Sequence, residues 1–292
     1  MDAILQIIIT GLTLGAMYAL ASVGLALTYG TMGMFNMAHG VFMTVGAYSA
    51  YAAVVYLGLS FPVALVTGLA VGAAIGAVMH LLVVRHMLKT EGFEINIIVA
   101  TAGVAILSED LILRIFGAYP FRQPLQLDGT FRVGGLAVTY QSVGILAAAA
   151  ALVGLMAWIL TQTRFGLAIR ATAMNREAAM LMGVKADQIY LQVLVIAGLL
   201  AAAAGIMISS LATLSPQMGA NPLLRAFVIC VVAGLGSVAG AGFAAVALGL
   251  FEAAIQYYYG VRYGFPLMLA LVIIVLIWKP AGLFGQQEVT RS

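Results

Sequence analysis

The sequence predicts an all-α integral membrane protein, a polytopic helical bundle of about eight to ten membrane segments with two related halves and broken helices. Of the 292 residues, 64% are hydrophobic and only 8% are charged, whereas soluble domains are about half apolar and a quarter charged. The apolar residues form repeated charge-poor stretches of about 20 residues, the length of a helix that crosses a bilayer. A membrane β-barrel would show short alternating segments instead.

The apolar stretches define the expected membrane segments. In chain order they cover residues 4–29, 41–57, 63–84, 95–116, 142–160, 189–214, 226–235, 243–257 and 266–277. The first stretch has no basic flank and runs past the length of a cleavable signal, so we interpret it as the first span. Some of the later stretches are too short to span a bilayer alone. We expect one transmembrane domain over residues 1–292.

Loops with Lys and Arg indicate the cytoplasmic side of a membrane protein. The two most basic loops, 85–94 and 163–187, are separated by two crossings, so they agree in placing this side. The loop 117–140 then lies outside, despite Arg122 and Arg132. By the same count the N-terminus is outside and the C-terminus inside. The net charge of +3 therefore reports topology, and we expect no nucleic-acid partner.

Two parts of the chain repeat one pattern, residues 30–48 and 216–241. In each, a break that contains Gly and Asn precedes a short apolar stretch and more glycine. Paired interruptions of this kind indicate a substrate pathway, because freed backbone groups at membrane depth must line a cavity or be covered by protein. The alternative is that both are ordinary loops between spans.

The segment 163–187 combines positive charge with a helical apolar pattern. Its cationic residues, of 13 in the whole chain, are Arg164, Arg170, Arg176 and Lys185. Its apolar positions share one face of a helix over 167–182, and they are Leu167, Ala171, Met174, Ala178, Leu181 and Met182. Burying three or four cations at the bilayer centre would cost about 10 kcal/mol. The segment is therefore a surface helix ended by Gly183, either in the lipid interface or on a partner protein.

Four motifs of the chain resemble those of one protein family. In chain order they are "FNMAHGVFMTVGAY", "GLAIRATAMNREAAMLMGV", "VVAGLGSVAGAGFAAVALGLFEA" and "KPAGLFG". They look like the permease subunits of ABC importers, in particular the branched-chain amino acid permease family, over nearly the whole chain. The resemblance implies that the basic helix couples to a separate ATPase through Arg170, Ala171, Asn175, Ala178 and Gly183. It also implies a translocation pathway near Asn36, His39, Gly40, Asn221, Gly234 and Gly236.

The same resemblance implies the partners of the chain in the cell (inner) membrane. They are two ATP-binding subunits, a homologous second permease that is a different chain, an extracytoplasmic solute-binding protein and membrane lipid. ATP and Mg would be bound by the partners, and no G-x-x-x-x-G-K-[ST] loop occurs in this chain. The stretch "NPLLRAF" departs from the glycine-richer pattern of leucine-type permeases. The solute therefore stays open among branched-chain amino acids, other amino acids, amides and urea.

The remaining polar residues give little chemistry. The three histidines lack metal-ligand spacing, and the single Cys230 has no partner for an intrachain disulfide. Asp110 and Arg114 are spaced to pair along a helix. Glu252 is the only acid deep in a later apolar run, and it either couples an ion or serves as a structural hydrogen-bonding group. We expect no catalytic, cofactor-binding or metal-binding residue.

Other glycines are spaced for close helix packing. They are Gly11, Gly15, Gly68, Gly72, Gly76, Gly236 and Gly240. Two alternative functions remain. An ion-coupled secondary transporter or channel would depend on Glu252, and an intramembrane enzyme would need a nucleophile or metal cluster whose spacing does not appear here.

Overall fold

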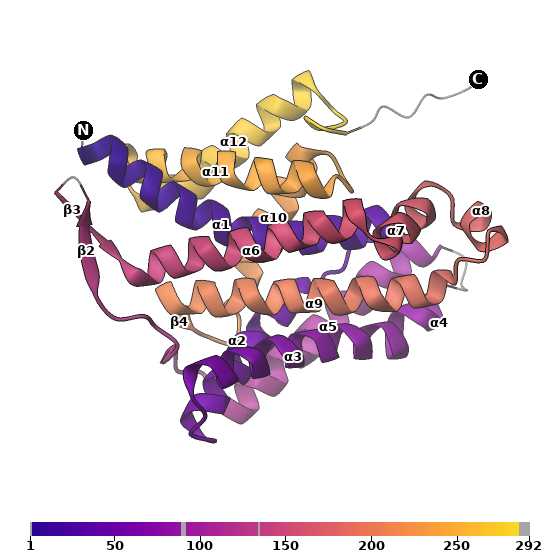
Figure 1. Cartoon of the computed structure of the whole chain (residues 1–292), viewed down its shortest axis with the longest axis horizontal. Coiled ribbons are helices and arrows are strands. Elements are labelled where there is room, and N and C mark those ends of the chain that lie inside the picture. The colour runs from indigo at the N-terminus through magenta and orange to yellow at the C-terminus, as the bar shows by residue number, and fades with distance from the viewer. Residues whose placement is uncertain (1, 89–91, 134, 286–292) are drawn as a thin grey trace.

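The computed structural model describes residues 2–88, 92–133 and 135–285, and they form a helical bundle elongated along one axis (Figure 1). Its helices are α1 (Asp2–Met32), α2 (His39–Val55), α3 (Phe61–Met79), the π-helical turn η1 (His80–Val84), α4 (Arg85–Met87), α5 (Phe93–Phe116), α6 (Tyr140–Gln162), α7 (Arg164–Met174), α8 (Arg176–Leu181), α9 (Ala186–Leu211), α10 (Ala220–Ala233), α11 (Val238–Tyr259) and α12 (Val261–Trp278). Its strands are β1 (Phe121–Arg122), β2 (Thr130–Val133), β3 (Leu136–Thr139) and β4 (Thr213–Leu214). The strands pair antiparallel, β1 with β4 and β2 with β3.

The predicted class is confirmed. Within the described residues, seven helices are long and apolar enough to cross a membrane, and α2 and α10 are shorter apolar helices. The predicted stretches 226–235 and 266–277 begin too late, because α10 starts at Ala220 and α12 at Val261. The first predicted stretch begins after Arg225, and the second begins at Pro266. Pro222 lies in the first turn of its helix, where no backbone N–H partner is needed, and α12 accommodates Pro266 internally.

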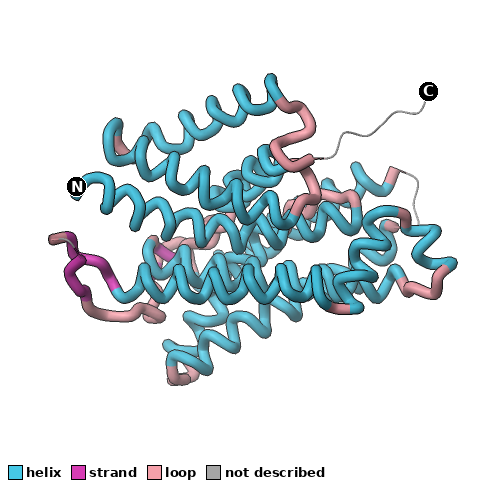
Figure 2. Tube along the Cα trace, turned by 45° about the horizontal axis from the view of Figure 1, so that its top comes forward, coloured by secondary structure: helices cyan, strands magenta, loops and turns pink. Residues whose placement is uncertain are grey.

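The bundle has two ends that differ in structure. One end carries α7, α8 and the described end of the chain, and the opposite end carries the N-terminus and the β2–β3 hairpin (Figures 1 and 2). We call them the α7–α8 end and the hairpin end. The two basic loops share the α7–α8 end, since Arg85 Nε lies 3.8 Å from Asp187 Oδ2. Residues 89–91 of the first basic loop and residues 286–292 lie outside the described residues.

The two halves of the chain run in opposite directions. Helix α1 runs toward the α7–α8 end, whereas α9 runs toward the hairpin end (Figure 1). Each is followed by an irregular break and a short helix, α2 or α10. The two long helices also pack reciprocally, α1 on α11 and α9 on α3. This arrangement is an inverted repeat, which many membrane transporters use to form a central pathway.

The two short helices begin inside the bundle and meet there. His39 at the start of α2 contacts Ala21, well before α1 ends at Met32. A side chain on Gly40 would place its Cβ only 2.7 Å from the carbonyl oxygen of Gly219, directly before α10. Since α2 leads to the hairpin end and α10 to the α7–α8 end, each is a half-helix that enters the membrane interior from an opposite side.

Glycine contacts hold the long helices together, as predicted. On α3, Gly72 packs against Gly198 of α9 and Gly76 against Leu194, and on α1, Gly15 packs against Val246 of α11. At these positions a Cβ would collide with backbone atoms of the neighbouring helix. Small residues let helix backbones approach closely where lipid offers no hydrophobic driving force for association.

Candidate functional site

The basic segment is two helices rather than the single helix expected over 167–182. Asn175 has an extended backbone between α7 and α8, and its Oδ1 accepts a hydrogen bond of 2.9 Å from the N–H of Ala178. An Asn at this position starts a new helix better than it continues one, because its side chain satisfies a free backbone donor. Gly183, with φ of +87°, follows the end of α8 as expected.

One surface of this segment is exposed and partly apolar. Gly166, Ile169, Thr172 and Ala179 are its buried positions. Exposed apolar side chains lie opposite, and they are Leu167 at 61%, Met174 at 89%, Leu181 at 88% and Met182 at 85%. We call them and the exposed cationic Arg170 the α7–α8 surface. A surface of this kind is typical of a site that binds a partner protein or the membrane.

The residues that the resemblance implied for coupling lie on or beside the α7–α8 surface. Arg170, Asn175, Ala178 and Gly183 are exposed, and Ala171 is half-buried. A partner on the α7–α8 surface could therefore contact all of them.

The segment is firmly joined to the long helices. The N–H of Val184 donates 3.0 Å to the carbonyl of Ala179, and the guanidinium of Arg176 lies 5.5 Å from the ring centre of Tyr190 on α9. At the start of α9, Asp187 Oδ1 lies 3.1 Å from Nε2 of the buried His80 in η1. These contacts connect α8 to α9, and α9 to η1 at the end of α3.

Sequence reasoning missed the contact between His80 and Asp187. The two residues are 107 positions apart, so no helical spacing relates them. The signal was a lone histidine in an apolar stretch, which is often a hydrogen-bonded group.

The two breaks meet at the junction of α2 and α10. Asn36 is buried and its Oδ1 accepts 3.0 Å from the N–H of Ala38. His39 is fully buried, and its Nε2 donates 3.0 Å to the carbonyl of Ala21. Gly40 packs on Gly219. Asn221, in the first turn of α10, is exposed on this chain, so the junction presents a polar group at membrane depth.

The other two glycines proposed for the pathway lie elsewhere. Gly234 and Gly236 form the turn between α10 and α11, both with positive φ. Gly236 packs on Gly30 near the end of α1, and Gly234 packs on Gly282 and the residues that follow it. The structure thus separates the predicted pathway residues into a junction inside the bundle and a turn toward the α7–α8 end.

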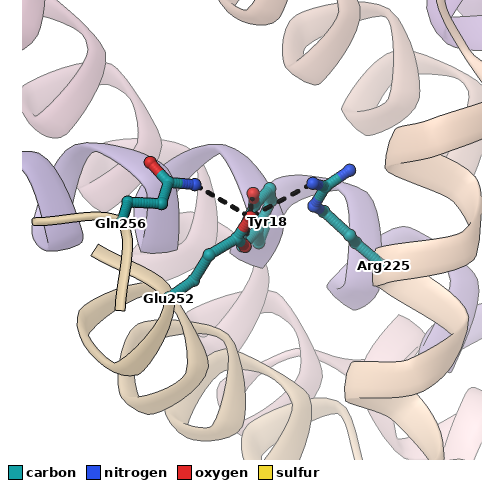
Figure 3. Close-up of polar contacts among 4 residues, drawn as sticks. All are labelled: Tyr18, Arg225, Glu252 and Gln256. Atoms are coloured by element: carbon teal, nitrogen blue, oxygen red, sulfur yellow. Dashed lines mark hydrogen bonds and ion pairs between the residues drawn. The ribbon is translucent and has the colours of Figure 1, made fainter. Parts of the chain in front are cut away.

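Four residues from three helices form a buried polar network (Figure 3). Glu252 of α11 is only 1% exposed. Its carboxylate accepts hydrogen bonds from Tyr18 Oη of α1 at 2.9 Å, Arg225 Nη2 of α10 at 3.1 Å and Gln256 Nε2 at 3.1 Å. The guanidinium of Arg225 also lies 4.9 Å from the ring centre of Phe265 on α12. With three donors bonded to it, this carboxylate fits the structural alternative better than ion coupling.

Comparison with known proteins identifies the family. The model of the family described as branched-chain amino acid transport system / permease component matches residues 7–277. The chain belongs to this permease family. Among its relatives, the high-affinity branched-chain amino acid transport system permease protein BraD of Pseudomonas aeruginosa is 26% identical, over 98% of this chain and 97% of the relative. No solved structure matches the chain.

Two further permeases are similar to this chain over most of the length of both proteins. The permease protein LivH of the Escherichia coli branched-chain amino acid system is 28% identical over 98% of this chain and 97% of that protein. A probable branched-chain amino acid permease of Methanocaldococcus jannaschii is 28% identical over 91% of this chain and 88% of the relative. The family likeness therefore includes both halves, the α7–α8 segment and the two breaks.

Within the described parts of the chain, no three His, Cys, Asp or Glu side chains are grouped so that they could hold a metal ion. Asp110 and Arg114 form the predicted i,i+4 pair, with 2.6 Å between Oδ2 and Nε.

Proposed function

We propose that this permease takes up branched-chain amino acids, or another small polar solute, at the expense of ATP hydrolysed by partner subunits. The observation that carries the proposal is the exposed α7–α8 surface, which is joined through α8 and Asp187 to two long helices of the bundle. The full-length similarity to permeases named for branched-chain amino acid transport supports the choice of solute.

In this proposal each ATPase subunit docks on one permease at the α7–α8 surface. Leu167, Met174 and Leu181 supply apolar contact area, and Arg170 supplies a charge. When the ATPases close, α8 moves, and the contact between Arg176 and Tyr190 transmits the displacement to α9. The pair of His80 and Asp187 then shifts α3 with α9. ATP and Mg are bound by the partners, and no residue of this chain is catalytic.

The translocation pathway lies between this permease and a second, homologous one. The last helix of each half, α5 and α12, is little buried within this chain. Helix α5 contacts the first break, where the N–H of Met37 donates 3.0 Å to the hydroxyl of Thr101. Helix α12 contacts the half-helix α10, where Arg225 lies against the ring of Phe265. Irregular backbone at membrane depth must be covered or line a water-filled cavity. A second permease that covers α5 and α12 would enclose a passage beside the exposed Asn221.

An extracytoplasmic solute-binding protein would deliver the solute at the hairpin end. The α7–α8 end is then cytoplasmic, which agrees with the positions of the basic loops. The alternative of an ion-coupled transporter receives less support, because Glu252 is engaged by three hydrogen-bond donors.

The test is affinity purification of the tagged permease from its native membrane under gentle conditions. We expect an ATPase to copurify with the wild type and with Arg132→Glu, a matched charge reversal at the hairpin end. Arg170→Glu should lose or weaken that ATPase because it reverses the charge of the α7–α8 surface. Intact wild-type protein that brings down no ATPase, or equal ATPase recovery with Arg170→Glu, would count against coupling at this surface.

A further inference from the structure

A polar pocket of about 590 Å³ opens at the hairpin end, at the C-terminal end of α9. Most of the membrane-facing surface of the chain is apolar, so a polar pocket of this size is unusual here. Its lining includes one cation and one anion, Arg122 and Asp128, together with amide and hydroxyl side chains. Its volume lies within the range of small-molecule sites, roughly 300–1,000 Å³.

The wall of the pocket is fixed by hydrogen bonds to Ser210, a buried residue at the end of α9. Gln126 Nε2 donates 2.8 Å to the Ser210 carbonyl, and Gln141 Nε2 donates 2.7 Å to its hydroxyl. The Oε1 of Gln141 accepts 2.8 Å from the N–H of Leu127. The loop before β2 is therefore held against both α6 and α9, and the pocket is a built feature of the fold.

Arg122 is held in place by its neighbours, and neither Arg122 nor the other charged residue of the pocket, Asp128, is neutralised by a described ion pair. Arg122 pairs with Thr213 across the β1–β4 ladder, and its Nη2 donates 3.0 Å to Gln126 Oε1. Neither Arg122 nor Asp128 forms an ion pair with another residue that the structure describes. A guanidinium has five N–H donors, so Arg122 keeps donors for a ligand. A cation and an anion that line one polar pocket are complementary to a small zwitterion.

We propose that this pocket binds the α-carboxylate and α-ammonium groups of an amino acid before it enters the pathway. Arg122 would take the carboxylate, which a guanidinium can bind with two parallel hydrogen bonds, and Asp128 would take the ammonium group. The pocket also lies where a solute could move inward, because its lining residues 210–213 lead directly into the break before α10. The inference rests on the proposed function and adds a first, weak subsite to it.

The experiment measures binding of L-leucine to the full-length permease in lipid nanodiscs, without binding protein or ATPase, by saturation-transfer NMR. Two probes each lack one charged group, isoamylamine without the carboxylate and isocaproate without the ammonium. We expect both to bind at least about tenfold more weakly than leucine, the loss typical of one charge-assisted contact. Arg122→Gln should abolish the preference for leucine over isoamylamine, and Asp128→Asn the preference over isocaproate.

Arg132→Gln is the matched control, because Arg132 lies on β2 and does not line the pocket; it should bind leucine as the wild type does. A monodisperse size-exclusion profile verifies that each variant is folded. The inference is overturned if leucine does not bind, if either probe binds as tightly as leucine, or if neither pocket variant changes the preference. Because no ATPase takes part, failure here is distinct from failure of the proposed coupling.

Discussion

At the scale of single residues, the pair of Arg225 and Glu252 shows how the bundle accommodates charge in its interior. An isolated ionised group inside a membrane protein is expensive, and a buried pair is tolerated when additional hydrogen bonds satisfy it. Here Tyr18 and Gln256 supply those bonds from α1 and α11. The network ties the half-helix α10 to α1 and α11, so it fixes the position of this half-helix in the bundle.

The network predicts unequal effects of single and double substitutions. Arg225→Gln leaves Glu252 buried without its counter-charge and should destabilise the protein by about 3–5 kcal/mol. Tyr18→Phe removes one hydrogen bond and should cost about 1–3 kcal/mol. The double variant Arg225→Gln, Glu252→Gln should be more stable than Arg225→Gln alone. Thermal unfolding in detergent, followed by tryptophan fluorescence, measures all three.

A double variant that is less stable than Arg225→Gln would show that the ion pair is not the main interaction in the network.

Uptake by the Glu252→Gln variant, if it still folds, should remain driven by ATP and be insensitive to a proton-gradient uncoupler.

At the scale of elements, the α7–α8 segment depends on a break that separates two short helices. A helix as short as α8 has little stability of its own, so its cap and its contacts with α9 hold it in place. The exposed apolar side chains of the segment can then keep one orientation for a partner.

Removal of the cap at Asn175 should weaken the docking surface without unfolding the bundle. Asn175→Ala loses the hydrogen bond to Ala178 and should destabilise α8 by about 1 kcal/mol, whereas Asn175→Ser keeps a capping oxygen. We expect less copurifying ATPase with Asn175→Ala and wild-type recovery with Asn175→Ser. Equal recovery with the two variants would mean that the cap does not shape the docking surface.

The packing of α3 on α9 predicts a contrast between two glycines. A Cβ on Gly198 would collide with the carbonyl oxygen of Gly72, whereas one on Gly103 of α5 would meet nothing within 4 Å. Gly198→Ala should therefore cost about 1–3 kcal/mol through overpacking, and Gly103→Ala should be neutral or slightly stabilising. Melting temperatures of the two purified variants decide this, and similar melting temperatures would contradict the close approach of the helices.

At the scale of the whole molecule, the inverted halves give the permease two chemically different ends. Half-helices that enter from opposite sides meet at Gly40 and Gly219, so each side of the membrane reaches the junction through one break. The hairpin end presents the polar pocket, and the α7–α8 end presents the surface on which we propose that an ATPase docks.

The orientation of these ends predicts a labelling pattern. With the buried Cys230 replaced by Ser, one new cysteine is placed at Tyr119, 84% exposed at the hairpin end, or at Leu181, 88% exposed at the other end. An impermeant maleimide should label Tyr119→Cys in intact spheroplasts and Leu181→Cys only after permeabilisation. The reverse pattern would invert the topology and remove the α7–α8 surface from the cytoplasm.

The sequence by itself determined the class of the protein, the order of its membrane segments and the place of the basic segment. These features depend on local composition, because a span needs only a sufficient length of apolar residues and a surface segment only its charge. The paired breaks and the helix-packing glycines could be predicted from the sequence for the same reason. Asn175 was also singled out from the sequence. The break between α7 and α8 was not predicted, because the apolar positions on both sides of Asn175 follow one helical period.

Only the tertiary structure decided which distant residues meet. The contacts of Glu252 with Arg225 and Tyr18, of His80 with Asp187, and of Gln141 with Ser210 join residues 27 to 234 positions apart. Helical periodicity relates neighbours along one helix and says nothing about which helices pack together. That choice follows from steric fit, as where Gly72 and Gly198 admit close backbone contact, and from the need of each buried polar group to find a partner.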